Sequence, residues 1–245
     1  MNTIKTVVFD LGGVLVDLDI DRCTGAFRSL GMDAVADLIN PYYPAEMIGR
    51  LEHGIISFHE ACDEMRRLDG RPEVTDSEIA AAYSAFLVGI PVAKLRQIMR
   101  LREAGVRTYV LSNNNPAAMV AIRGAFTADG HTMDDYFDKI YLSYELHELK
   151  PSEAIFRKVI ADSGIVPAQT LFIDDGQNRN RPRLILFHDV QGFCRQFMVD
   201  DDSRVFGHHG VDGPLQEIRA RFQTAADVAV GNKADQFTAF IDDGN

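Results

Sequence analysis

The sequence has few of the residues that mark disulfide-rich, zinc-binding or nucleic-acid-binding proteins. Its 245 residues include three cysteines, Cys23, Cys62 and Cys194, which are widely spaced and form no C-x-x-C pair. Neither a disulfide framework nor a structural zinc site is therefore expected. Lys and Arg number 25 against 36 Asp and Glu, which gives a formal net charge of −11. Such a surface repels phosphate backbones, so a general nucleic-acid partner is not expected.

Long apolar runs are also missing. No stretch approaches the roughly 18 apolar residues that a membrane-spanning helix needs, and the N-terminal MNTIKTVVFD lacks the apolar core of a signal peptide. We therefore expect a cytoplasmic protein without a membrane partner. No repeat or long heptad pattern indicates assembly, so we expect a monomer or a weak dimer.

The order of the segments that are present predicts an α/β fold. After an apolar strand at Val7, Val8 and Phe9, a block of segments with helical spacing follows without a convincing strand, at 20–31, 44–54, 57–70 and 76–90. Strands and helices then alternate: helix 92–105, strand 106–112, helix 116–128, strand 138–143, helix 152–164 and strand 170–174. This alternation predicts a doubly wound parallel sheet with the helical block inserted as a cap.

The same pattern divides the chain into three parts. We expect an α/β core at 1–17 and 92–190, a helical cap at 18–91, and an atypical C-terminal extension at 191–245. In a doubly wound sheet, ligands bind outside the carboxyl ends of the strands. The polar residues at or near those ends are Asp10, Ser112, Asn113, Lys150, Asp174 and Asp175. Each alone fits a turn or a helix entry, but together they indicate a site.

The chemistry that fits these groups is phosphoryl transfer through a phosphorylated aspartate. A carboxylate such as Asp10 can act as a nucleophile that divides one displacement into two easier ones. Because a carboxylate and a phosphate repel each other, the site needs positive charge, which Lys150 and a Mg²⁺ ion would supply. Mg²⁺ prefers carboxylate and carbonyl oxygens, so we expect Asp10, the backbone carbonyl of Gly12, Asp174 and Asp175 to hold it. The predicted catalytic residues are Asp10 and Lys150.

The other residues of the set are predicted to bind the phosphate. The Ser112 hydroxyl, with Asn113 and nearby backbone N–H groups, could hydrogen-bond the equatorial oxygens, and Lys150 would neutralise them. Gly12 and Gly13 would let the backbone approach the phosphate closely. This accounts for an apolar strand that ends in an aspartate followed closely by two glycines.

Four motifs in this order resemble those of the haloacid dehalogenase-like (HAD) hydrolases. FDLGGVLVD matches the first motif with Asp10 as nucleophile, VLSN the second with Ser112, LKP the third with Lys150, and FIDDG at 172–176 the acidic fourth. The resemblance covers residues 4–176 and implies a Rossmann-like core with a C1-type cap, as in subfamily IA. It also implies a Mg²⁺-dependent phosphatase acting on a small phosphorylated metabolite.

Two further stretches resemble one branch of that family. LEHGIISFHEA in the cap and LSYELHELKP before the lysine are similar to small sugar-phosphate phosphatases, including a glucose-1-phosphate phosphatase. The resemblance therefore implies a sugar phosphate as substrate.

The first departure from the family pattern is Gly12. The usual first motif is D-x-D, whose second aspartate acts as general acid toward the leaving group and then as base toward water. Its loss typically removes a factor of about 10² to 10⁴. The branch that this chain resembles commonly carries glycine there, so we expect a good leaving group, or help from a water, a substrate hydroxyl or a cap residue. Near Gly12 in the sequence, the ionisable candidates are Asp17, Asp19 and Asp21, which also fit a solvated turn and a helix start. In the cap, the candidates are His53 and His59, which also fit surface positions.

The second departure is the C-terminus. Arg179 stands where the family has an asparagine, and Pro182 falls where a helix should be running. Residues 183–190 instead predict an early strand. The tail is either a divergent extension, helical around 214–229 and partly disordered, or the product of a frame shift near Gln177, which the nucleotide sequence would settle.

Two other functions stay open at this point. Gly12 and the unusual tail are also compatible with a catalytically impaired phosphate-binding or regulatory protein. A phosphotransferase of the mutase type normally depends on the carboxylate that Gly12 replaces, and a dehalogenase attacks carbon without Mg²⁺, so the acidic pair argues against it.

Overall fold

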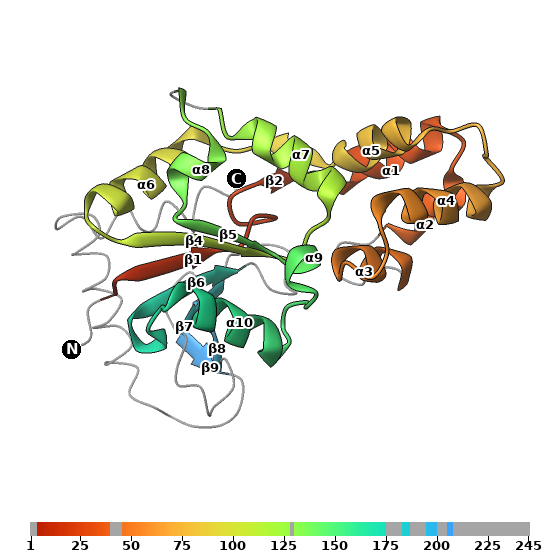
Figure 1. Cartoon of the computed structure of the whole chain (residues 1–245). Coiled ribbons are helices and arrows are strands. Elements are labelled where there is room, and N and C mark those ends of the chain that lie inside the picture. The colour runs from red at the N-terminus through yellow and green to blue at the C-terminus, as the bar shows by residue number, and fades with distance from the viewer. Residues whose placement is uncertain are drawn as a thin grey trace.

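The computed structural model describes residues 4–39, 46–127 and 130–174, together with the backbone of three strands between 183 and 207 (Figure 1). The elements in chain order are β1 (Thr6–Phe9), β2 (Asp17–Leu18), α1 (Ile20–Ser29), α2 (Asp33–Leu38), α3 (Glu46–Glu52), α4 (Phe58–Asp69), α5 (Asp76–Ser84), β3 (Leu87–Gly89), α6 (Val92–Glu103), β4 (Arg107–Ser112), α7 (Pro116–Ala125), α8 (Met133–Tyr136), β5 (Lys139–Leu142), α9 (Ser143–Leu146), α10 (Glu153–Ser163), the 3₁₀ helix η2 (Pro167–Gln169), β6 (Thr170–Asp174), β7 (Arg183–Leu186), β8 (Arg195–Val199) and β9 (Val205–Gly207).

A mixed sheet forms the centre of the molecule, in the strand order β5-β4-β1-β6-β7-β8-β9. β5, β4, β1 and β6 are parallel, with Phe9 of β1 in register with Val110 of β4 and Ile173 of β6. The carboxyl ends of these strands therefore lie at one edge of the sheet. The predicted α/β fold with a parallel sheet is confirmed.

Helices cover both faces of this sheet. Val7 and Phe9 pack with side chains of α6 and α7, whereas Val8, between them, packs with side chains of α10 on the opposite face. Figure 1 shows α6 and α7 on one side of the sheet and α10 on the other. Each of the three is at most 2% exposed. Because successive strand residues point to opposite faces and both faces are buried, the strand is an unbroken apolar run.

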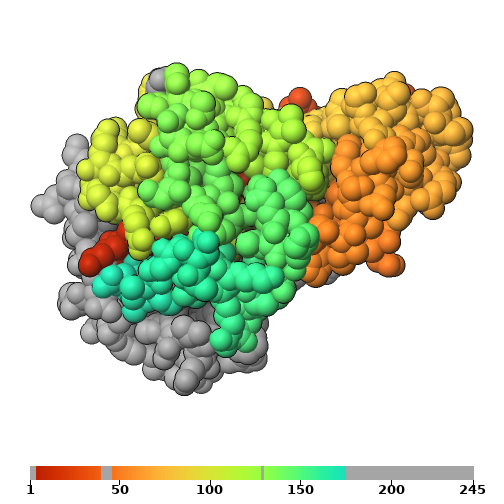
Figure 2. Space-filling model, viewed as in Figure 1, coloured from red at the N-terminus to blue at the C-terminus, as the bar shows by residue number. Residues whose placement is uncertain are grey.

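Helices α1 to α5 form a lobe with a hydrophobic core of its own. Phe27, Ile48, Met65 and Ile79, from four of these helices, are buried in that core. Figure 2 shows the lobe projecting from the rest of the molecule. The predicted boundaries of the cap at residues 18–91 stay a prediction.

A short antiparallel ribbon connects this lobe to the sheet. β2 pairs with β3, with Asp17 opposite Gly89. The helix expected over 76–90 is wrong in its second half, because α5 ends at Ser84 and β3 follows. Strands of two and three residues are too short to produce a recognisable period.

The C-terminal part continues the sheet with antiparallel strands. β7 pairs with β6 and lies at the start of the strand expected over 183–190. The helix expected around 214–229 lies outside the described residues, as do all positions of the extension 191–245 except β8 and β9. Divergence and a frame shift both stay predictions for the tail. Within the described residues, no helix is long and apolar enough to span a membrane.

Candidate active site

Asp10 lies at the carboxyl end of β1, between the ends of β4 and β6. Its backbone N–H donates to the carbonyl of Ile173 at 2.9 Å, so the β1–β6 ladder holds the residue in place. Its own Oδ1 accepts a hydrogen bond from the N–H of Leu11 at 2.7 Å. The residue is only 8% exposed. A buried carboxylate with fixed backbone partners is pre-organised to act as a nucleophile.

Lys150 joins Asp10 to Asp174 at this end of the sheet. Its Nζ lies 2.8 Å from Oδ2 of Asp10 and 2.7 Å from Oδ2 of Asp174, the last residue of β6. The ammonium also lies over the Phe172 ring, 5.3 Å from its centre, and the negative face of an aromatic ring attracts a cation. The structure thus brings together three residues that are far apart in the sequence.

The charges of this cluster explain its pKa shifts. Burial raises the pKa of Asp10 above its usual range; Lys150 opposes the shift, and the negative charge of Asp174 adds to it. For Lys150, burial lowers the pKa, but the two carboxylates outweigh it and raise the pKa above its ordinary value. With both carboxylates ionised, this ion-pair cluster carries one more negative charge than positive charge.

This charge imbalance makes the cluster suitable for a divalent cation. Two carboxylates approach the same ammonium. A cation beside them would offset burial and the charge of Asp174, which together raise the pKa of Asp10. In the described part of the chain, no group of three or more His, Cys, Asp or Glu side chains forms a metal site. A cation here would therefore need other oxygen ligands, such as the predicted Gly12 carbonyl and water. Asp175 lies outside the described residues.

Ser112 and Asn113 lie beside the cluster but have different partners. A hydrogen bond from the Ser112 hydroxyl favours ionised Asp10 and lowers its pKa. The Asn113 amide instead holds the backbone of Lys150: Nδ2 donates to its carbonyl at 3.1 Å, and Oδ1 accepts from its N–H at 2.8 Å. Asn113 therefore positions the lysine, and a direct contact between Asn113 and phosphate stays a prediction.

Gly12 and Gly13 form the turn that follows Asp10. A Cβ at Gly12 would lie 3.1 Å from Cδ1 of Leu18, so a side chain here would require Leu18 to move. Gly13 has a positive φ of 71°, which favours glycine, and its N–H donates to the carbonyl of Val16 at 3.0 Å. The glycines thus allow a tight turn next to Asp10. Whether their backbone contacts phosphate stays a prediction.

Three of the ionisable candidates for replacing a carboxylate at position 12 bind partners outside the site. Asp17 pairs with Nζ of Lys94 at 3.0 Å, and Asp19 caps the N-terminus of α1. His59 pairs with Asp76 on the surface of the lobe. These contacts agree with the alternative of a solvated turn, a helix start and a surface residue.

Glu52 is a candidate site residue that the sequence analysis missed. It is the last residue of α3, and its side chain is half-buried. Its pKa is raised to about 7, chiefly by burial; the charge of Asp10 also raises the pKa, and Lys150 lowers it. The sequence does contain a sign that α3 ends near Glu52, because glycine often follows the last turn of a helix and Gly54 stands two residues later. The position of that helix end over the site was not visible in the sequence.

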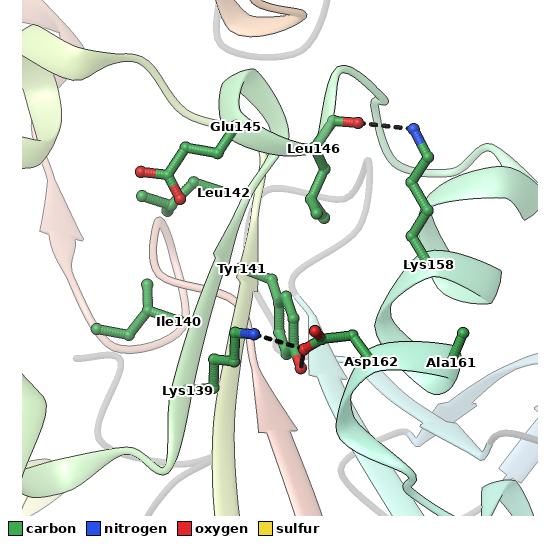
Figure 3. Close-up of a pocket in the computed structure, with 9 residues that line it drawn as sticks. All are labelled: Lys139, Ile140, Tyr141, Leu142, Glu145, Leu146, Lys158, Ala161 and Asp162. Carbon is green, nitrogen blue, oxygen red and sulfur yellow. Dashed lines mark hydrogen bonds and ion pairs between the residues drawn. The ribbon is translucent and has the colours of Figure 1, made fainter.

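A hollow of about 490 Å³ lies elsewhere, along the edge strand β5 (Figure 3). Its lining comes from β5, α9 and α10, and includes the ion pair between Lys139 and Asp162. Lys158, also in the lining, donates to the carbonyl of Leu146 at 2.7 Å. None of the predicted site residues lines this hollow.

Comparison with known proteins gives matches over the same part of the chain. Residues 4–182 match the family of haloacid dehalogenase-like hydrolases. A D-ribitol-5-phosphate phosphatase from Bacteroides thetaiotaomicron is 39% identical over 176 residues, which are 71% of this chain and 84% of that protein.

Solved structures give similar results. A wild-type HAD family enzyme from Bacteroides thetaiotaomicron, in complex with magnesium and inorganic phosphate, is 38% identical with a TM-score of 0.66, over 71% of this chain and 85% of that one. A HAD-like family hydrolase from Porphyromonas gingivalis is 37% identical with a TM-score of 0.64, over 71% of this chain and 83% of that one.

Proposed function

This chain belongs to the haloacid dehalogenase-like hydrolases, and we propose that it is a Mg²⁺-dependent phosphatase that hydrolyses a small phosphorylated metabolite through an aspartyl phosphate on Asp10. The family expected from the four motifs is confirmed, and so is the prediction of a hydrolase. The relative named as a D-ribitol-5-phosphate phosphatase supports phosphate monoesters as the substrate class.

The observation that carries this proposal is the pair of short contacts from Lys150 to Asp10 and Asp174. In the first step, an Asp10 oxygen attacks phosphorus and the bond to the leaving oxygen breaks. In the second step, water attacks the phosphorus of the aspartyl phosphate and releases Asp10 and inorganic phosphate. In the first step Lys150 lowers the repulsion between Asp10 and the incoming phosphate, and in the second it stabilises the carboxylate that Asp10 becomes as it leaves.

Mg²⁺ would be held by Asp10, Asp174 and the carbonyl of Gly12, with Asp175 as a further proposed ligand. Bound there, it supplies positive charge to the transferring phosphoryl group. The complex of a similar HAD family enzyme with magnesium and inorganic phosphate supports this assignment. Ser112 would donate a hydrogen bond to the phosphoryl oxygens.

A sugar phosphate or sugar-alcohol phosphate is the proposed substrate. The relative is named for its activity on a phosphorylated polyol, and the cap resembles that of sugar-phosphate phosphatases; both support this class. The negative net charge supports a small ligand rather than a nucleic acid. The cytoplasmic location and the monomeric or weakly dimeric state stay predictions.

A catalytically impaired phosphate-binding protein is the second candidate, because Gly12 has no carboxylate. Phosphate release from a panel of sugar and polyol phosphates, with Mg²⁺ or EDTA, separates the two candidates. The proposal predicts Mg²⁺-dependent turnover that Asp10→Asn abolishes while binding is retained. A folded protein that binds phosphate but releases none from any substrate would favour the binding protein.

A further inference from the structure

Gly12 leaves the proposed reaction without a source for one proton. When the phosphoryl group moves to Asp10, a sugar or polyol leaves as an alkoxide, which is a poor leaving group unless it is protonated. Asp10 is the nucleophile and Lys150 is ion-paired to two carboxylates. The leaving group therefore needs another acid. This inference rests on the proposed function.

The end of α3 is attached directly to the wall of the site. The Ser143 hydroxyl, which is fully buried at the end of β5, donates to the backbone carbonyl of Glu52 at 2.6 Å. The same hydroxyl accepts from the N–H of Asn114 at 3.0 Å, two residues after Ser112. One buried side chain thus ties Glu52 to the loop that follows β4.

Two further contacts fix this attachment between α3 and α9, which lie next to each other in Figure 1. Nε2 of His53 lies 2.9 Å from the carbonyl of His147. Gly54 has a positive φ of 71°, and a Cβ at this position would lie 2.3 Å from the backbone carbonyl of Tyr144. Only a residue without a side chain permits this approach, so the helix end is held close to the sheet.

The side chain of Glu52 responds to the charges of the site. Asp10 raises the pKa of its carboxyl group and Lys150 lowers it, so the three groups lie within reach of one another's charges. Burial, and after it the charge of Glu52, raises the pKa of the half-buried Tyr83 of α5. Among the described residues, no hydrogen bond or ion pair of the Glu52 carboxyl group is found, which leaves it available to a substrate.

We propose that Glu52 is the general acid and base of the reaction, supplied by the helical lobe in place of a carboxylate at position 12. As the P–O bond to the leaving group breaks, the protonated carboxyl group of Glu52 donates its proton to the leaving oxygen, and the product departs as a neutral alcohol. Glu52, now a carboxylate, accepts a proton from the water that attacks the aspartyl phosphate. That proton restores the acid, so protons balance over the cycle.

A comparison of two leaving groups tests this role. An alkyl phosphate such as the best polyol phosphate needs a proton on its leaving oxygen, whereas 4-nitrophenyl phosphate leaves as a stable phenolate. Glu52→Gln should lower kcat/KM for the alkyl substrate by about 10² to 10⁴-fold and leave kcat/KM for the aryl substrate within about tenfold, because this ratio reports the transfer of the phosphoryl group to Asp10 and not the later attack of water. Loss of the base should slow that second step equally for both substrates. Glu46→Gln, at the exposed start of the same helix, should change neither rate.

Chemical rescue separates a catalytic from a structural role. In Glu52→Ala, added formate or acetate should restore part of the alkyl turnover, because a small carboxylic acid can occupy the space of the side chain. A retained aryl kcat/KM shows in the same assay that each variant is folded.

Equal losses of kcat/KM on both substrates, or a purely KM effect without rescue, would overturn the role of Glu52 while leaving the phosphatase intact. Absence of turnover in the unmodified protein on both substrates would overturn the proposed function and this role with it.

Discussion

Replacing Lys150 with methionine should destabilise the folded protein in a way that depends on pH. The Lys150 side chain is 10% exposed and contacts Asp10 and Asp174, whose side chains are 12% and 13% exposed. Its removal leaves two buried carboxylates side by side, and the site can recover its charge balance by binding one proton. Protonating an aspartate with an ordinary pKa of about 3.9 costs about 4 kcal/mol at pH 7 and about 1.5 kcal/mol at pH 5. These values are upper limits for the loss.

The sign of the pH dependence follows from the same reasoning. In Lys150→Met the folded-state pKa of the carboxyl pair lies above the unfolded value, so the folded state binds more protons. The cost is therefore absent below the unfolded pKa and grows as pH rises toward the folded pKa. We expect losses of about 3 kcal/mol at pH 7 and about 1 kcal/mol at pH 5.

Urea unfolding with EDTA at both pH values measures these losses. Lys158→Met is a matched control, because Lys158 is 45% exposed and lies 3.5 Å from its partner Glu148. Its loss should stay below about 1 kcal/mol and change little with pH. The double variant Asp10→Asn with Lys150→Met should lose most of the pH dependence. A Lys150→Met loss equal to that of Lys158→Met, or independent of pH, would refute the account of the buried cluster.

Three further predictions concern the helical lobe. Gly54→Ala should lower the free energy of unfolding by roughly 1 to 3 kcal/mol and also lower kcat, because its Cβ would meet a backbone carbonyl of α9. Gly49→Ala is the control: a Cβ there has nothing within 4 Å, so urea unfolding should show a gain of up to about 1 kcal/mol. Ser57→Ala removes the capping box of α4 and should lower the free energy of unfolding by about 1 kcal/mol; an unchanged value would contradict the importance of that cap. The hydrogen bond to Asp76 raises the pKa of His59. The pair's contribution to stability is therefore complete below the unfolded pKa of 6.5 and is lost as pH rises through the folded pKa. Asp76→Asn should lower the pKa of His59 in an NMR titration.

The parallel sheet and part of the site could be predicted because both follow from local rules. Unbroken apolar runs at Val7 to Phe9 and at β4 and β6 indicate strands buried on both faces. The carboxyl ends of parallel strands meet at one edge, so the strand pattern alone predicts that Asp10, Ser112 and Asp174 lie together. Lys150 was placed by its motif, and its contacts with both carboxylates agree with that placement.

The rest depends on tertiary packing that no local pattern encodes. Glu52 is one acid among many in the helical lobe, and its position over the site depends on a buried hydroxyl of α9 and on the contact at Gly54. Asn113 follows the end of a strand, which is where a phosphate ligand is expected. Its amide nevertheless hydrogen-bonds the backbone of Lys150, which is far away in the sequence. The β2–β3 ribbon is too short to have a period.

Trapping the proposed covalent intermediate tests the central claim most directly. The protein is mixed with a sugar phosphate and Mg²⁺, quenched during turnover, and reduced with borohydride, which converts an aspartyl phosphate into homoserine. Peptide mass spectrometry should then find homoserine at position 10 in the unmodified protein, and none in samples without substrate or in Asp10→Asn. Turnover without homoserine at position 10, together with an active Asp10→Asn variant, would contradict the account.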